Sequence, residues 1–528
     1  MLLPAQMLTN VARNYRGKVA YSCGSFSRTW SEMDDRSTRL NGALAALGVR
    51  AGDAVAILGQ ESIEIYEHYF ACMKGGYVRV GINWRYASNE VFHILRDCNA
   101  KFILVDARCQ PLLEETLAIG DLPGLTVIGY GDVHAANLDY ERCLLRGERV
   151  NQRHSAPNDP LVVSYTSGST GVPKGVIHSH QSVAMIIYQA AISRGLTTDD
   201  VWTAAIASSW MACTLNMIGL ANGMTTVIMD GVFDVGDFIE DARRHKISAA
   251  LLVPTIMGRV LGQVGGQCES LSSLRLLMYG SSPAPADLLR SFHDAFGCRM
   301  MQTYGMTEGG WVSHLMPSDH ILGLTHRPEL LRSAGRGGGL YQLSIRDESG
   351  REVANGERGE IWVNGPTTML GYLNHPSETS EAMQDGWLKT NDIGYFDDEY
   401  LYLVDRKKFL IITGAVNVFP ATVEAVLCRH PDIAEISVVG TAHPHWGEAV
   451  VAVIVTKDGR ALPSVEDLND FARSNLSRPE LPKHVLGVPD LPKTVTGKID
   501  KKSVKQWVDS QAHMMPWEPQ NPMAGGAP

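Results

Sequence analysis

Paired cysteines and long basic runs are both lacking from this sequence of 528 residues. The nine cysteines form no Cys-x-x-Cys pair, which argues against a disulfide framework and suits a protein of the reducing cytoplasm. Acidic residues outnumber basic ones by 57 to 47, giving a net charge of -10, so the composition argues against nucleic acid as the main partner. The first residues have no basic segment followed by an apolar core, and we expect no secretion signal.

Charge is also missing from Thr203 to Met229, a stretch long enough to cross a bilayer. Hydroxyl and amide residues such as Ser208 and Asn216 interrupt this stretch, and acidic residues flank it. We therefore predict a buried or pocket-lining segment and no membrane span.

What is abundant is alternation between short apolar runs and segments with helical spacing. Residues 54–59, 77–82 and 101–106 suit strands, and residues 62–74 and 89–97 suit helices. Apolar runs that end in turn residues return at 245–254 and 274–285. This alternation favours parallel sheets covered by helices, an α/β fold.

The character of the sequence changes at a charged cluster, Asp405 to Lys408. A helix candidate at 421–430 and two apolar strand candidates follow it. We expect a large N-terminal domain with helix-covered sheets over 1–404, a hinge at 405–408, and a small mobile α+β C-terminal domain over 409–528.

The strongest motif is YTSGSTGVPKGV, from Tyr165 to Val176. Glycines, hydroxyl residues and one lysine follow an apolar run, which predicts a strand that leads into a loop. Backbone N–H groups and hydroxyls of such a loop can bind phosphate oxygens while Lys174 supplies positive charge. The spacing is not that of a Walker A loop, because Lys174 lies three positions after Gly171.

This motif resembles the phosphate loop of the adenylate-forming superfamily, which includes acyl- and aryl-CoA synthetases. The resemblance continues in order through YGSSPAP (279–285), QTYGMTEGG (302–310), the blocks at 359–379, 385–411 and 430–455, and LPKTVTGKID (491–500). It implies a two-step reaction in which a carboxylate attacks the α-phosphate of ATP, and a thiol, usually that of coenzyme A, then takes the acyl group from the adenylate.

The resemblance also assigns residues to the nucleotide and to Mg²⁺. Thr307 would contact the α-phosphate, Glu308 would hold Mg²⁺, Asp392 would accept hydrogen bonds from the ribose, and Arg406 would contact the nucleotide. The phosphate loop would supply Thr166, Ser167, Gly168, Ser169, Thr170, Gly171 and Lys174, and the adenine would lie between Tyr304 and the turn of Gly280, Ser281, Ser282 and Pro283.

Two lysines near the C-terminal region complete the family pattern. Lys498 follows Gly497 in the last block, and the resemblance makes it the catalytic lysine, whose ammonium bridges the carboxylate and the α-phosphate. Lys408 matches the family's hinge position.

The sequence departs from the family pattern at three places. Ser209 and Trp210 replace the usual aromatic–histidine pair of the acyl pocket, and Asn391 replaces the glycine before Asp392. Asn tolerates a left-handed backbone, so we expect the turn at Asn391 to survive. Ala415 follows Gly414 where a second glycine normally lies beside the path of coenzyme A, so a methyl group there would narrow that path.

The acid itself is not readable, but its site is expected to mix small residues with tryptophans. That mixture suggests an apolar or ring-bearing carboxylate larger than acetate. The expected pocket residues are Ser209, Trp210, Thr214, Met278, Gly309 and Trp311.

Several alternatives stay open. The acceptor could be a carrier protein acting in trans, and only one half-reaction could be retained; a non-catalytic nucleotide-binding protein is a third possibility. An oligomer is possible. His178 with His180, and His443 with His445, have the spacing of one face of a strand, but no cysteine or carboxylate converges on them to suggest a metal site.

Overall fold

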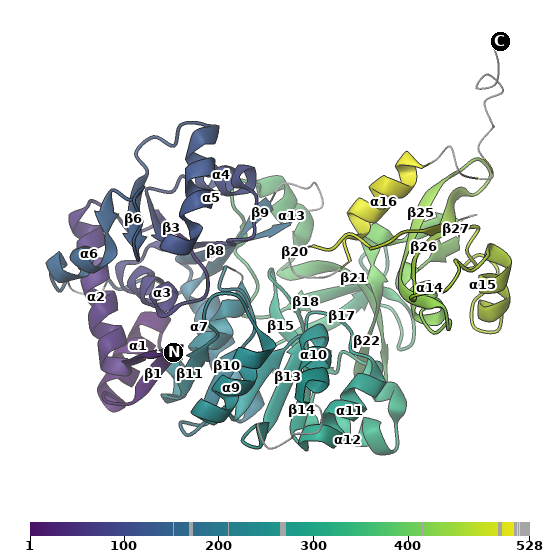
Figure 1. Cartoon of the computed structure of the whole chain (residues 1–528), viewed down its shortest axis with the longest axis horizontal. Coiled ribbons are helices and arrows are strands. Elements are labelled where there is room, and N and C mark those ends of the chain that lie inside the picture. Colours follow the sequence, from purple (N-terminus) through teal and green to yellow (C-terminus); the bar gives the residue numbers. More distant parts are fainter. Residues whose placement is uncertain are drawn as a thin grey trace, which may run out of the picture. The chain divides into compact units, whose positions relative to one another are not determined.

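The computed structural model describes residues 1–150, 153–167, 173–209, 211–264, 271–413, 416–494, 499–511, 515 and 517. Helices and strands alternate along most of this length (Figure 1), so the predicted α/β class is confirmed. The chain divides into two compact units. Unit 1 comprises residues 1–344, 362–390 and 399–401, and unit 2 comprises residues 345–361, 391–398 and 402–528. The predicted domain boundary at 404 and the hinge stay predictions.

Unit 1 contains two large sheets. The nine-stranded sheet has the order β16 (Arg336–Gly337), β15 (Gly310–Leu315), β14 (Arg299–Met306), β13 (Leu276–Gly280), β12 (Ala249–Leu252), β10 (Val201–Ala204), β11 (Thr225–Ile228), β1 (Val19–Cys23) and β2 (Phe26–Thr29). The eight-stranded sheet has the order β19 (Gly371–Tyr372), β9 (Pro173–Ser179), β8 (Pro160–Ser167), β4 (Val78–Ile82), β3 (Ala54–Leu58), β5 (Phe102–Asp106), β6 (Thr126–Tyr130) and β7 (Leu138–Asp139).

The strand and helix predictions between residues 54 and 106 are confirmed. Strands β3, β4 and β5 pair in parallel, and the intervening helices are α3 (Ile63–Gly75) and α4 (Ser88–Asp97). Gly76 ends α3 with a left-handed backbone, φ +68°.

The period of two along the buried strands explains the layers of unit 1. In β3, Val55 and Ile57 pack in the same core as α3, whereas Ala54, Ala56 and Leu58 pack with α4 on the other face. In β13, Met278 packs with α7 (His180–Arg194), whereas Leu277 packs with α9 (Val235–His245), α10 (Pro254–Val264) and α11 (Ala286–Phe296). Helices α3 and α7 therefore share cores with the inward faces of the two sheets.

The remaining helices of unit 1 pack around these cores (Figure 1). They are α1 (Pro4–Asn14), α2 (Trp30–Ala46), α5 (Gln110–Ile119), α6 (Tyr140–Arg146), α8 (Gly219–Asn222), α9 (Val235–His245), α10 (Pro254–Val264), α11 (Ala286–Phe296), α12 (Pro317–Thr325) and α13 (Pro376–Ala382), with the short 3₁₀ helices η1 (Ala107–Cys109), η2 (Met211–Met217) and η4 (Pro328–Arg332).

Two five-stranded sheets account for the other strands. One has the order β17 (Gln342–Arg346), β18 (Gly359–Asn364), β21 (Trp387–Asp397) and β20 (Met383–Gln384), with β22 (Tyr400–Arg406) on β21. The other lies in unit 2 and has the order β24 (Val416–Val418), β23 (Ile411–Thr413), β26 (Gly447–Thr456) and β25 (Ile433–His443), with β27 (His484–Gly487) on β26. Its helices are α14 (Pro420–Leu427), α15 (Val465–Ala472), α16 (Lys501–Ser510) and the short η5 (Lys407–Phe409).

The uncharged stretch from Thr203 to Met229 folds as parts of β10, η2, α8 and β11 instead of one long helix. Ser208, Thr214 and Asn216 within it are buried, which confirms the prediction of a buried segment. Among the described residues, no helix combines the length and the apolar character that crossing a bilayer requires.

Candidate active site

The predicted phosphate loop joins two antiparallel strands, β8 and β9, in which Thr166 lies opposite Lys174. Lys174 lies on β9, not within the loop as its motif suggested, because Pro173 and the apolar residues after it continue the ladder. Its ammonium is 3.2 Å from Oε1 of Glu378 on α13. The hydrogen bond from Lys174 lowers the pKa of the Glu378 carboxyl. Glu378 was not predicted, although it lies inside the family block at 359–379.

The predicted metal ligand, Glu308, lies with Thr307 in the tight turn between β14 and β15. The hydroxyl of Tyr372 donates to Oε1 of Glu308 over 3.1 Å, and the amide of Met369 donates to its backbone oxygen over 2.8 Å. Burial raises the pKa of Tyr372, so the hydroxyl stays a donor at neutral pH. Since no described residue donates to Oε2, that oxygen is free to bind a cation.

His178 connects the two motifs. This buried residue of β9 donates from Nε2 to the backbone oxygen of Thr307 over 2.6 Å. Burial lowers its pKa to about 4, so the ring is neutral at physiological pH. The strand that carries Lys174 is thereby fixed against the turn that carries Glu308. His180 begins α7 instead of continuing β9, so the two histidines do not share a strand face as their spacing suggested.

The predicted adenine turn follows β13, which runs parallel to β14, so both strands end at the same edge of the nine-stranded sheet. A Cβ on Gly280 would lie 2.5 Å from the backbone oxygen of Thr303, which explains why only glycine fits there. Ser281 has a left-handed backbone, φ +70°, and Tyr304 on β14 is buried. Ser282 and Pro283 continue the turn after Ser281.

The two residues predicted for ribose and nucleotide binding in unit 2 lie together. Nε of Arg406 is 3.0 Å from Oδ1 of Asp392. Asn391 has φ +59° within β21, so the left-handed backbone predicted there is confirmed, although the residue lies in a strand and not in a turn. Its amide donates to Glu360, which also binds Lys407 over 3.0 Å. Lys408 is exposed in η5.

The predicted acid-pocket residues are largely buried in unit 1. Ser209, Thr214 and Met278 are buried, and Trp311 is partly buried. Gly309 is held from the next segment, because the hydroxyl of Thr367 donates to its backbone oxygen over 2.6 Å.

An unpredicted pair fixes the segment that precedes this pocket. Oε1 of Glu61 accepts from the amide of Ser208 over 2.7 Å, and Arg79 of β4 donates to the backbone oxygen of the same residue over 2.8 Å. Burial raises the pKa of Glu61 to about 7. The one charged residue in an otherwise apolar strand is the signal that could have identified Arg79 from sequence.

Eight predicted residues lie outside the part of the chain that the structure describes, and their roles stay predictions. They are Gly168, Ser169, Thr170, Gly171, Trp210, Gly414, Ala415 and Lys498. The side chain of Ser167 is likewise not described.

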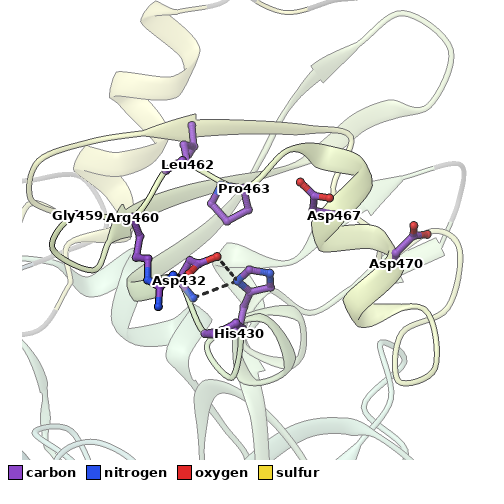
Figure 2. A pocket seen from close by; sticks show the side chains of 10 residues that line it. His430, Asp432, Gly459, Arg460, Leu462, Pro463, Asp467 and Asp470 are labelled. Carbon is purple, nitrogen blue, oxygen red and sulfur yellow. Dashed lines mark hydrogen bonds and ion pairs between the residues drawn. The ribbon is translucent and has the colours of Figure 1, made fainter.

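The described residues provide no ready-made cage for a metal ion. Nowhere among them do three or more histidine, cysteine, aspartate or glutamate side chains gather as ligands. The open hollow of unit 2 drawn in Figure 2 contains none of the predicted site residues; its polar side chains are His430, Asp432, Arg460, Asp467 and Asp470. A cation at Glu308 would thus need oxygen ligands from substrate phosphates and water, which is how Mg²⁺ is commonly bound.

Two family models match this chain. The family model for AMP-binding enzymes matches residues 8–373, and the model for the C-terminal domain of AMP-binding enzymes matches residues 422–498. A fatty acid–[acyl-carrier-protein] ligase of Streptomyces coeruleorubidus is 32% identical, with 93% of this chain and 94% of the relative covered. An indoleacetate–CoA ligase of Aromatoleum aromaticum is also 32% identical, with 94% and 96% covered.

Among solved structures, the amide bond synthetase McbA from Marinactinospora thermotolerans is similar over 96% of this chain and 99% of its own. The TM-score is 0.84 and the identity is 29%.

Proposed function

Because the chain belongs to the AMP-binding enzyme family of adenylate-forming ligases, we propose that it activates an apolar or ring-bearing carboxylic acid with ATP and transfers the acyl group to coenzyme A. The observation that carries this proposal is the convergence within unit 1 of Lys174 and Glu308, fixed by His178 and Tyr372. The indoleacetate–CoA ligase supports a ring-bearing acid and the coenzyme A acceptor.

In the first step, a carboxylate oxygen of the acid would form a bond to the α-phosphorus of ATP. The bond from that phosphorus to the bridging oxygen breaks, and pyrophosphate leaves with the electron pair. We assign Thr166 and Lys174 to the β- and γ-phosphates, because they face each other across the hairpin. Thr307 would bind the α-phosphate with its hydroxyl, since its backbone oxygen already accepts from His178.

Glu308 would hold Mg²⁺ through its open oxygen while Tyr372 orients the carboxylate. The ion, when bound, would neutralise phosphate charge, which supports in-line displacement. Asp392 would accept from the ribose hydroxyls, and Arg406 beside it would contact the nucleotide.

Lys498 is proposed to bridge the acid and the α-phosphate as negative charge develops. In the second step, the thiol sulfur attacks the acyl carbon, AMP leaves with the oxygen that joined them, and the thiol proton passes to water. Lys408 is proposed as the hinge about which the C-terminal domain moves between the two steps. The segment with Gly414 and Ala415 is proposed to line the path of the thiol.

The acceptor has two supported alternatives. The fatty acid–[acyl-carrier-protein] ligase supports a carrier protein, and the amide bond synthetase supports an amine. The three acceptors share the adenylate, so the first step is independent of this choice.

Pyrophosphate exchange into ATP with a panel of acids tests the first step. We expect exchange with at least one ring-bearing acid, and we expect Lys174→Ala to lower it at least tenfold. Lys457→Ala, at an exposed lysine of unit 2, is the matched control and should exchange at the wild-type rate. If no acid supported exchange, or if Lys174→Ala were unimpaired, the proposal would be wrong. Supplying coenzyme A, a phosphopantetheinyl carrier or an amine to the adenylate then identifies the acceptor.

A further inference from the structure

Arg194 is a buried cation without a carboxylate partner among the described residues. It is the last residue of α7, 4% exposed, on the side of the helix that packs against the nine-stranded sheet. Its Nε donates to the sulfur of Met278 over 2.6 Å and its Nη1 to the hydroxyl of Ser193 over 3.1 Å. Within the described part of the chain, Nη2 has no hydrogen-bond partner. A buried guanidinium normally has its donors satisfied by an anion or by oxygen acceptors.

His314 presents a second unused donor beside Arg194. It is buried in β15, and its Nε2 lies 3.4 Å from the side-chain amide nitrogen of Gln189, which also donates to the backbone oxygen of Trp311 over 3.0 Å. Since that nitrogen is a donor, Nε2 must be the acceptor, and the ring proton lies on Nδ1. No described residue accepts from Nδ1. Burial, with the nearby charge of Arg194, lowers the pKa of His314 to about 3, so the ring is neutral.

Both donors lie next to residues predicted to line the acid pocket. Arg194 contacts Met278, and Gln189 joins His314 to Trp311. His314 lies opposite Thr303 in the sheet, and Thr303 lies opposite Gly280 at the end of β13. The buried hydroxyl of Thr303 also has no partner among the described residues.

The surrounding polar groups are already engaged with one another. Tyr341 donates to Oε1 of Gln189 over 3.1 Å, and its hydroxyl also lies 2.7 Å from that of Thr367. Gln189 therefore has its oxygen and its nitrogen occupied, which fixes its orientation. What remains open is a set of donors, one of them cationic, beside the predicted pocket residues Met278 and Trp311.

We propose that Arg194 and His314 form a polar subsite for a second oxyanion or strong hydrogen-bond acceptor on the acid, distant from the carboxyl group that is activated. The acid is then bifunctional: a ring or chain with a carboxyl group at one end and a carboxylate, phenolic or similar oxygen at the other. This inference rests on the proposed function, because it concerns the acid which that function consumes. Gly280 and Thr303 place the subsite on the strands that lead to the predicted adenine turn.

The test uses matched acids on the full-length enzyme, for instance 3-phenylpropanoate against 3-(4-carboxyphenyl)propanoate and 3-(4-hydroxyphenyl)propanoate. Pyrophosphate exchange gives kcat/KM for each. Wild type should favour the acids with the distal oxygen at least tenfold. Arg194→Met should lose at least tenfold on those acids while retaining its rate on 3-phenylpropanoate. Arg259→Met, at an exposed arginine of α10, is the control and should keep the wild-type preference.

A second measurement separates failure of this inference from failure of the proposed function. The acid-induced rise in melting temperature without ATP reports binding alone. If no acid were adenylated but the distal-oxygen acids still raised the melting temperature through Arg194, the subsite would stand and the proposed reaction would fall. Equal use and equal binding of both kinds of acid by wild type would overturn the subsite. If Arg194→Met lost the same activity on both kinds of acid, the subsite would also be overturned. Arg194→Lys keeps the charge and should retain part of the preference, so it serves as the second variant if Arg194→Met fails to fold.

Discussion

Lys174 and Arg194 are both cations of unit 1, but their surroundings differ. Lys174 has a side chain that is 15% exposed and lies 3.2 Å from Glu378, whose side chain is 33% exposed. Arg194 is buried and has no carboxylate partner among the described residues. A partly solvated ion pair exchanges one anion for another at small cost, whereas a buried lone cation carries a constant desolvation cost. Under the proposed function, Lys174 would exchange Glu378 for phosphate, whereas Arg194 would select the acid.

The largest effect is expected from Glu308→Gln, which removes the charge proposed to hold Mg²⁺ but keeps an oxygen for the hydroxyl of Tyr372. Pyrophosphate exchange should fall roughly 10²–10³-fold, the usual effect of removing one electrostatic group from a transition state. Tyr372→Phe, which leaves the charge and removes only its orienting donor, should lose about tenfold or less. An unchanged exchange rate in Glu308→Gln would show that Glu308 does not hold the metal ion. The comparison between the nucleotide site and the acid subsite would then fail.

Gly280→Ala tests the end of β13, which lies next to the predicted adenine turn and to Thr303 of the proposed acid subsite. The new Cβ would lie 2.5 Å from the backbone oxygen of Thr303, so β13 and β14 must separate. The free energy of unfolding should fall by about 1–3 kcal/mol, a typical penalty for overpacking. Urea denaturation measures this value, and Gly262→Ala on α10 is the control, since a Cβ added there would meet nothing within 4 Å. Equal stability of the two variants would show that β13 tolerates a side chain there.

Acidification should destabilise unit 1, because several of its buried histidines are neutral in the folded protein. Burial lowers the pKa of His178, His180 and His320 to about 4 and that of His314 to about 3. Between those values and the usual 6.5, the unfolded chain binds more protons than the folded one, so stability is full above about pH 6.5 and falls as the pH drops. Each histidine contributes at most about 1.4 kcal/mol per pH unit in that window.

Denaturation at pH 7 and pH 5 measures this loss. His320→Gln should reduce the difference in the free energy of unfolding between pH 7 and pH 5 by the contribution of one histidine. His320 lies outside the nucleotide site and the proposed acid subsite, and each of its ring nitrogens makes one hydrogen bond. Stability that stayed constant from pH 7 to pH 5 would contradict the assignment of these rings as neutral and buried.

The smallest effect is expected from Glu378→Gln. An ion pair of this exposure contributes about 0.2–1 kcal/mol, so the melting temperature should barely move. The KM for ATP should stay equal or fall slightly, since Lys174 would then have no competing anion. A large loss of exchange would mean that Glu378 itself takes part in nucleotide binding, and the simple contrast with Arg194 would no longer hold.

Much of the fold was predictable because strand and helix periodicity is local. The alternation at residues 54–106 and the left-handed Asn391 each follow from neighbouring residues, and both predictions are confirmed. The flanking glycines predict a loop position for Lys174, but its ladder partner Thr166 extends β9 to include it. Local pattern does not show where a ladder stops.

The proposed acid subsite was harder to predict from sequence for a physical reason. Arg194 precedes Gly195, which caps α7 with a left-handed backbone, and a basic residue in the last turn is ordinarily a solvated partner of the helix dipole. Its burial depends on how α7 packs on β13, a contact between residues far apart in the chain. The same holds for Glu61 and Arg79, whose common partner is Ser208.

His178 also offers a spectroscopic probe of the nucleotide side. A carbonyl oxygen only accepts, so the bond to Thr307 requires the proton on Nε2. In the neutral ring Nδ1 is then unprotonated and can accept from the hydroxyl of Ser182, 3.3 Å away. In ¹⁵N nuclear magnetic resonance, the two ring nitrogens should thus give well-separated signals of a single tautomer, with an Nε2 proton that exchanges slowly with solvent. A ligand that moves the Thr307 peptide would alter that resonance before any product forms.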